Sequence, residues 1–250
     1  MLLEDRTAVI YGAGGSIGGA VASAFAREGA RVHLVGRTQA KLDAIADRIL
    51  SAGGIAETAQ VDALDEAAVD AHADAVAAQD GAIDISFNLI SHPYTHGVPM
   101  VEMTPEDYLR PVTVAVRTTF LTARAAARHM IRQGSGVILA FGGSGEPMDD
   151  YSLGGTQVAF EAIESMRRQL ACELGPHGIR VVTLQTAGVP DSMGSVDARD
   201  EIVDAIVRKT MLKRAATLDD VGNVAAFAAS DHARSMTATA LNITCGTVVD

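Results

Sequence analysis

Short hydrophobic runs rich in β-branched residues alternate along the chain with alanine-rich stretches in which hydrophobic residues recur every three or four positions. A short hydrophobic run bounded by turn residues predicts a strand, and the three-to-four spacing predicts a helix with one buried face. The predicted strands span residues 7–11, 31–36, 56–62, 83–88, 136–141, 179–185 and 239–244. The helical stretches between them include residues 17–28, 39–51, 65–79, 106–132 and 156–174.

This alternation predicts an α/β fold. Strands this hydrophobic are buried on both faces, as in parallel sheets, and strand–helix–strand repeats form right-handed crossovers. Since no linker or repeat divides the chain, we expect residues 1–250 to form a single-domain Rossmann fold, with a doubly wound parallel seven-stranded sheet and helices on both faces. Three irregular stretches, 89–104, 142–155 and 186–197, each follow a strand, so we expect them at the carboxyl edge of the sheet, where such folds bind ligands.

The composition narrows the range of functions. The net charge of −11 argues against a nucleic-acid partner or an anionic membrane surface. No hydrophobic run is long enough to predict a membrane span, and the first residues lack the pattern of a signal peptide. The two cysteines, Cys172 and Cys245, do not have the spacing of a metal or redox site. We therefore expect a cytoplasmic protein without a metal site.

A glycine-rich segment, YGAGGSIGGA at residues 11–20, follows the first predicted strand and opens the first helix. A turn this tight favours residues without a Cβ, and it lets a phosphate group approach backbone N–H groups at the helix start. The pattern therefore predicts a dinucleotide site. Close packing of the helix on the sheet, without a ligand, is the alternative explanation.

The segment resembles the T-G-x-x-x-G-x-G motif of the short-chain dehydrogenase/reductase family. Tyr11 replaces the threonine and Ser16 replaces the middle glycine. The resemblance extends over nearly the whole chain, including ACELGPHGIRVV before and within the sixth strand. It implies an oxidoreductase that uses a nicotinamide dinucleotide. It assigns cofactor binding to Gly12, Ser16, Ile17, Gly18, Arg37, Asp62, Asn88, Gly188 and Ser192.

Arg37 bears on the choice of cofactor. The second strand ends in Gly36-Arg37, where an aspartate would bind the ribose hydroxyls of NAD(H) and an arginine attracts the 2′-phosphate of NADP(H). We therefore expect NADP(H) to be preferred over NAD(H). The alternative is that Arg37 is a solvated charge near the start of a helix.

The family's catalytic Asn-Ser-Tyr-Lys tetrad has no counterpart here. Aligning AIESMRRQLACELG, residues 162–175, with the family's helix puts the four tetrad positions, in the order Asn, Ser, Tyr and Lys, at Ala115, Gly143, Thr156 and Phe160. The chain has three lysines, and none lies four residues after a tyrosine. Tyr151-Ser152 begins a near-match to the Y-S-x-x-K motif, but Gly155 replaces the lysine.

Other polar residues follow the fourth and fifth strands and offer replacement chemistry. We take Tyr151 as the first candidate for the proton donor, with Ser144 as a hydrogen-bond partner of the substrate oxygen, and His92 and His96 as the next candidates. Pro93 argues against a helical two-histidine metal site. The expected substrate pocket is lined by His92, Tyr94, His96, Met148 and Met193.

Three functions remain open at this point. The first is an NADP(H)-dependent oxidoreductase with a small carbonyl, alcohol or enone substrate and a non-standard proton donor. The second is a catalytically inactive nucleotide-binding sensor or partner protein, and the third is a protein that binds a small molecule but no dinucleotide. We also expect a homo-oligomer, with a tetramer as the expected form, because residues 106–132 and 156–174 resemble the helices through which the family pairs its subunits.

Overall fold

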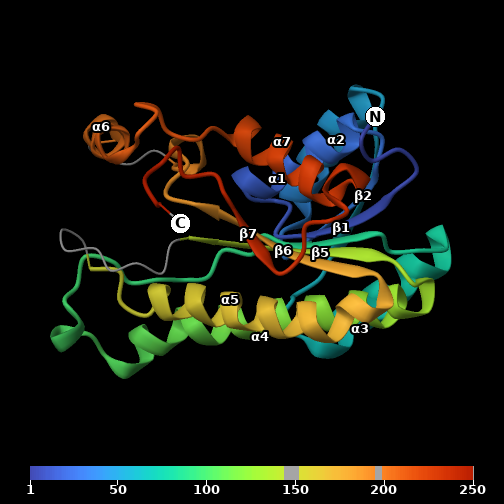
Figure 1. Cartoon of the computed structure of the whole chain (residues 1–250), viewed down its shortest axis with the longest axis horizontal. Helices are drawn as coiled ribbons and strands as arrows, with labels where there is room; N and C mark the ends of the chain where they lie inside the picture. The colour runs from blue at the N-terminus through green and yellow to red at the C-terminus, as the bar shows by residue number, and fades with distance from the viewer. Residues whose placement is uncertain (144–151, 195–198, 250) are drawn as a thin grey trace.

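The computed structural model describes residues 1–143, 152–194 and 199–249 (Figure 1). Their strands form one seven-stranded sheet in the order β3-β2-β1-β4-β5-β6-β7, and each pair of neighbours is parallel. The strands are β1 (Thr7–Tyr11), β2 (Arg31–Gly36), β3 (Ile55–Gln60), β4 (Ile85–Asn88), β5 (Gly136–Gly143), β6 (Ile179–Thr186) and β7 (Thr239–Asn242). The chain reverses its direction of winding between β1 and β4, which is where such sheets bind ligands.

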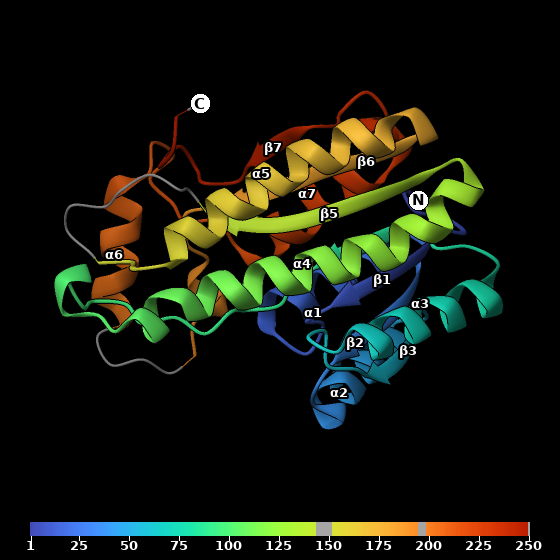
Figure 2. The same ribbon diagram turned by 90° about the horizontal axis from the view of Figure 1, so that it is seen from below.

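Helices cover both faces of the sheet. In Figures 1 and 2, α3, α4 and α5 lie across one face, and α1, α2 and α7 lie on the other. Helix α6 lies beyond the end of the sheet. The helices are α1 (Ser16–Arg27), α2 (Gln39–Ser51), α3 (Glu66–Asp80), α4 (Pro105–Gln133), α5 (Thr156–Leu174), α6 (Arg199–Lys209) and α7 (Leu218–Ala229), with short 3-10 turns η1 (Met100–Glu102), η2 (Gly175–His177), η3 (Pro190–Ser192) and η4 (Asp231–Ala233). Within the described ranges, the helices lack a hydrophobic stretch long enough to cross a membrane.

The core is divided by the sheet into two main layers. Phe25, Leu34 and Phe87 are buried between the sheet and the helices α1, α2 and α7. Tyr11 and Met130 are buried on the other side, beneath α3, α4 and α5. This burial on both faces explains why the strands read as continuous hydrophobic runs.

The predicted fold class is confirmed. Strands β1 and β2 have the predicted bounds, and each of the other five differs from the prediction by one or two residues at one or both ends. Strand β3 ends at Gln60 because the chain turns at Asp62, whose carboxylate accepts the Leu64 N–H at 3.0 Å. Helix α6 was not predicted. Six of its eleven residues are charged, which makes this segment less hydrophobic than the helices that pack along the sheet.

Candidate active site

The turn between β1 and α1 has room only for glycine at two positions. Gly12 has a positive φ of 80°, and a Cβ there would lie 2.5 Å from the Leu89 carbonyl oxygen. A Cβ at Gly18 would lie 2.3 Å from the Gly12 oxygen. The N-cap of α1, Gly15, offers no side chain to cap the helix, so the first N–H groups of α1 are available to an anion. Ser16 is exposed and Ile17 half-buried at this helix start, an arrangement that fits the pyrophosphate of a dinucleotide.

Arg37 follows β2 and is exposed beside this turn. Its backbone carbonyl accepts a hydrogen bond from Gln60 Nε2 at 2.9 Å, which fixes the end of β2 to β3. Within the described ranges its guanidinium forms no ion pair. Asp62 is also exposed at this edge. The charges of both residues can therefore face a bound nucleotide.

Asn88 locks the end of β4 to α4. Its Oδ1 accepts the Ile90 N–H at 2.9 Å. Its Nδ2 lies 3.3, 3.5 and 3.4 Å from the hydroxyl oxygens of Thr118, Thr119 and Thr122. The Asn88 side chain is buried, with 8% exposure, so this network sets the direction in which the chain leaves β4.

The four positions that the resemblance assigns to the tetrad form a mainly hydrophobic group. Ala115 is buried in a small cluster with Ala140, Ala159 and Ile163 on α4, β5 and α5. Gly143 ends β5, and a Cβ there would lie 2.6 Å from Phe160 Cε2. The Phe160 ring therefore fills the space in front of Gly143.

Thr156 is the first residue of α5 and is buried, with 4% exposure. Its hydroxyl oxygen lies 3.1 Å from His96 Nε2. His96 is stacked on Tyr94, with ring centroids 3.9 Å apart. The loop that carries His96 is tied to the segment before α5 by the Gly97 N–H, which donates to the Ser152 oxygen at 2.8 Å. A histidine from the loop after β4 thus meets the residue at the family's tyrosine position.

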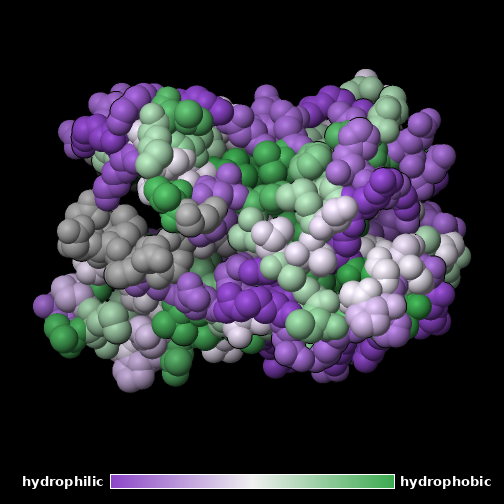
Figure 3. Space-filling view, viewed as in Figure 1, coloured by the Kyte–Doolittle hydropathy of each residue, from purple (hydrophilic) through white to green (hydrophobic). Residues whose placement is uncertain are grey.

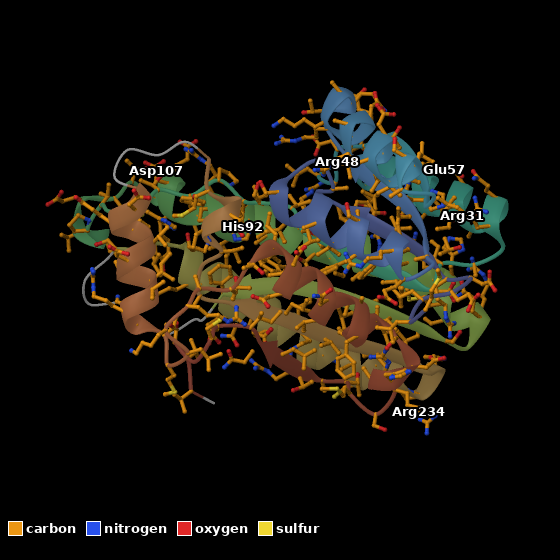
Figure 4. The ribbon with its side chains drawn as sticks, turned by 90° about the horizontal axis from the view of Figure 1, so that it is seen from above. Arg31, Arg48, Glu57, His92, Asp107 and Arg234 are labelled. Carbon is orange, nitrogen blue, oxygen red and sulfur yellow. The ribbon has the colours of Figure 1, made fainter. Side chains whose placement is uncertain are left out.

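His92 lies on the edge of the Phe160 ring, with centroids 5.8 Å apart. Figure 4 shows His92 toward the end of the molecule that holds α6 and the start of α4. Burial lowers the pKa of both His92 and His96 from the usual value for histidine. For His92, a hydrogen bond with the Ile90 backbone opposes this shift in pKa, and the nearby His96 adds to it. Both imidazoles are therefore neutral at neutral pH and able to accept a proton.

Gly155 explains why the near-match that begins at Tyr151 lacks its lysine. A Cβ at Gly155 would clash with the backbone carbonyl oxygen of Tyr108 on α4, so the position admits no side chain. The preceding Gly154 has a positive φ of 56°. Tyr151, Ser144 and Met148 lie outside the described residues.

The loop after β6 supplies the remaining predicted residues. Gly188 has a φ of 129°, and a Cβ there would lie 3.2 Å from Ile206 Cδ1, so α6 covers this turn. The Ser192 hydroxyl donates to the Val189 carbonyl at 2.7 Å. Met193 is half-buried in the same loop. The cover by α6 was missed from the sequence, although Ile206 belongs to a helical pattern in residues 199–209.

One group of side chains away from this edge has the composition of a metal site. Ligand atoms of His33, Glu57 and Asp80 lie within 4.8 Å of one another. Arg31, however, lies 3.5 Å from each of the two carboxylates, and His33 Nε2 lies 2.6 Å from Asp80. Because Arg31 already supplies the positive charge that a metal ion would, the group is an ion-pair network. In Figure 4, Arg31 and Glu57 lie at the right of the molecule, away from His92, which lies nearer the middle.

Comparison with known proteins identifies the family. A family model described as enoyl-(acyl carrier protein) reductase matches residues 12–247. The chain is 30% identical to a probable galactose dehydrogenase, GalD, of Rhizobium meliloti (strain 1021), over 98% of this chain and 95% of that protein. It is also 30% identical to D-threitol dehydrogenase of Mycolicibacterium smegmatis (strain ATCC 700084 / mc(2)155), over 92% of this chain and 88% of that protein.

Solved structures agree with this result. A short-chain type dehydrogenase/reductase from Mycobacterium marinum superposes with a TM-score of 0.87 at 26% identity, over 99% of this chain and 97% of that one. The family model begins at the glycine turn and runs past β7, and these relatives cover 92–99% of the chain. The chain belongs to the short-chain dehydrogenase/reductase family of oxidoreductases, which use NAD(H) or NADP(H).

Proposed function

We propose that this oxidoreductase uses NADP(H) to interconvert a small carbonyl compound and its alcohol, or to reduce an enone, without the family's catalytic tetrad. The observation that carries the cofactor preference is Arg37, which is exposed at the end of β2 next to the uncapped start of α1. A guanidinium at this place pairs with a 2′-phosphate through charge-assisted hydrogen bonds. The two sugar and polyol dehydrogenases among the relatives support a small substrate that carries hydroxyl groups.

Different residues of the chain bind different parts of the cofactor. The N–H groups at the start of α1 hold the pyrophosphate, and Asp62 faces the adenine. Asn88 keeps the wall of the site in place through its bonds to α4. Gly188 and Ser192 line the nicotinamide end. When bound, the cofactor supplies the hydride.

A titration of cofactor binding tests this proposal. We expect wild-type protein to bind NADPH more tightly than NADH, and Arg37→Ala to weaken NADPH binding about tenfold or more while NADH binding changes little. Arg234→Ala is the matched control, since Arg234 is also exposed but lies elsewhere on the molecule (Figure 4). Equal affinity of the wild type for both cofactors contradicts the preference. A screen of NADPH oxidation with ketones, quinones and enones then tests turnover.

A second candidate function is that of a catalytically inactive sensor or partner protein that binds the nucleotide. The residues at the tetrad positions favour it, because Ala115, Gly143 and Phe160 offer no group that transfers a proton. The same two experiments separate the candidates. Tight NADPH binding with no turnover across the whole screen favours the inactive protein.

We also propose that the chain forms a cytoplasmic homo-oligomer, with a tetramer as the expected form. Hydrophobic side chains on α4 and α5 are exposed, namely Leu109, Phe120, Ile131 and Val158. In Figure 3, hydrophobic residues also gather at the lower left, around the start of α4. Met100 and Val101 of η1, just before α4, are exposed. Covering such side chains is the main driving force of subunit association. The unpaired cysteines Cys172 and Cys245 are consistent with a reducing compartment.

A further inference from the structure

We propose that His96, held by Thr156, is the proton donor and acceptor of this site in place of the family's tyrosine. The inference rests on the proposed oxidoreductase function and names the residue that moves the proton. Three observations carry it: the contact between the two side chains, the anchoring of the loop that carries His96, and the partial exposure of the imidazole.

The contact joins two segments that are distant in sequence. His96 Nε2 lies 3.1 Å from Thr156 Oγ1, although the residues are 60 positions apart. Thr156 is buried at the first position of α5, and its N–H donates to the Leu153 oxygen at 3.2 Å. The hydroxyl is therefore held in place by the start of the helix. A hydroxyl at this distance holds the imidazole in one orientation, and because it can donate or accept, it fits either tautomer of His96.

The loop that carries His96 is anchored on both sides of the histidine. Before it, the Ile90 N–H donates to Asn88, which is itself locked to α4. After it, the Gly97 N–H donates to the Ser152 oxygen. Tyr94 stacks on the imidazole and limits its rotation. An acid or base that must meet a substrate oxygen at hydrogen-bond distance needs this kind of orientation.

The imidazole replaces the missing phenol in space. The threonine side chain is much shorter than a tyrosine, and His96 reaches over its hydroxyl from the neighbouring loop. His96 is half-buried rather than enclosed, so its ring can meet both a substrate and water. Burial keeps the pKa of His96 below its usual value, which suits a group that must release a proton.

The proton transfer balances as follows in the reducing direction. The substrate's carbonyl carbon gains a hydride from NADPH, and the π electron pair of the C=O bond moves onto oxygen. That oxygen takes a proton from the small fraction of His96 that is protonated as imidazolium, which becomes neutral imidazole and recovers a proton from solvent. In the oxidising direction neutral His96 removes the hydroxyl proton. Thr156 orients the ring throughout and is a positioning residue.

The test uses the full-length protein with the best substrate from the NADPH screen. His96→Gln keeps a side-chain N–H for Thr156 but has no group that titrates. We expect it to lower kcat by roughly 10²–10⁴-fold, to leave the NADPH dissociation constant within about twofold, and to regain part of its rate when imidazole is added. His177→Gln, at an exposed position of η2, is the matched control and should keep the wild-type rate.

Thr156 is tested by a second pair of variants and by a measurement that needs no cofactor. Thr156→Val should shift the ring nitrogen resonances of His96 in ¹⁵N-histidine spectra of the cofactor-free protein, and it should lower kcat more than it changes KM. Thr156→Ser should restore both. Unchanged His96 resonances in Thr156→Val overturn the proposed pair.

The remaining outcomes separate this inference from the proposed function. Full turnover by His96→Gln overturns the role of His96 and leaves the oxidoreductase function intact; loss of activity in Tyr151→Phe would then move the donor to Tyr151. NADPH binding without turnover of any substrate by the wild type overturns the donor role and favours the inactive protein. Failure of the wild type to bind NADPH or NADH overturns both.

Discussion

Replacing Gly143 by alanine tests directly whether Phe160 fills the family's serine position. The new Cβ would lie 2.6, 3.0 and 3.1 Å from three atoms of the Phe160 ring. Carbon atoms prefer to be about 3.5–4.0 Å apart, so the ring must move by roughly 1 Å. Overpacking of this kind costs about 1–3 kcal/mol. In a chain of this length, each 1 kcal/mol lowers Tm by about 2–4 °C.

The neighbouring residue provides a matched control. A Cβ at Gly142 would meet Thr183 Cγ2 at 3.6 Å and Phe160 Cδ1 at 3.8 Å, both ordinary contacts. Gly142→Ala should therefore be neutral, or stabilise the protein by up to about 1 kcal/mol through the lower entropy of the unfolded chain. Comparing the two alanine variants separates the contact with the ring from the general effect of replacing a glycine.

A double-mutant cycle completes the assay. Phe160→Ala removes the ring, so Gly143→Ala should cost almost nothing in that background, and the coupling energy should be about 1–3 kcal/mol. Thermal and urea unfolding of the four proteins measure this energy. The reasoning is refuted if Gly143→Ala is as stable as Gly142→Ala, or if its cost persists without the Phe160 ring.

Three further results are expected. Gly155→Ala should cost about 3 kcal/mol or more in urea unfolding, because the backbone of Tyr108 blocks its Cβ, whereas Gly175→Ala, which meets open space, should cost far less. Burial lowers the pKa of His72 to about 4, so below about pH 6.5 the unfolded chain binds a proton that the folded state excludes. The free energy of unfolding should therefore fall by up to about 3 kcal/mol from pH 6.5 to pH 4. The fall should be smaller in His72→Leu, while His177→Leu should follow the wild type. Light scattering should give a mass above the 26.0 kDa of a single chain at micromolar concentration, and a monomer would exclude the proposed oligomer.

The fold and the glycine turn after β1 could be predicted from the sequence because their signals are local. Gly12 and Gly18 follow a hydrophobic run and precede a helical pattern, and only a residue without a Cβ fits either place. The contact of His96 with Thr156 leaves no local trace, since it joins residues 60 positions apart and depends on how two loops meet. The hydrogen bonds from Asn88 to the threonines of α4 could not be predicted for the same reason, because they join residues that are far apart in the sequence.

The near-match at Tyr151 shows the limit of a motif read alone. Its first two residues are present, and periodicity says nothing about why the lysine is missing. The answer lies in the approach of the Gly155 backbone to α4, which no spacing rule contains. Likewise, the sequence indicates only that Phe160 is a hydrophobic residue of a helix, whereas the structure shows that its ring fills the space in front of Gly143.

The contact of Gly12 with the backbone of Leu89 has a thermodynamic consequence. The phosphate turn and the first residue after β4 touch without an intervening side chain, and Leu89 leads directly into the loop that carries His92 and His96. Ordering of the turn by a bound dinucleotide therefore restrains the histidine loop as well. A bound cofactor should therefore raise the affinity for a ligand that contacts His96, and by linkage that ligand raises the affinity for the cofactor by the same factor. Backbone amides of the loop should also exchange their hydrogens more slowly when the cofactor is bound.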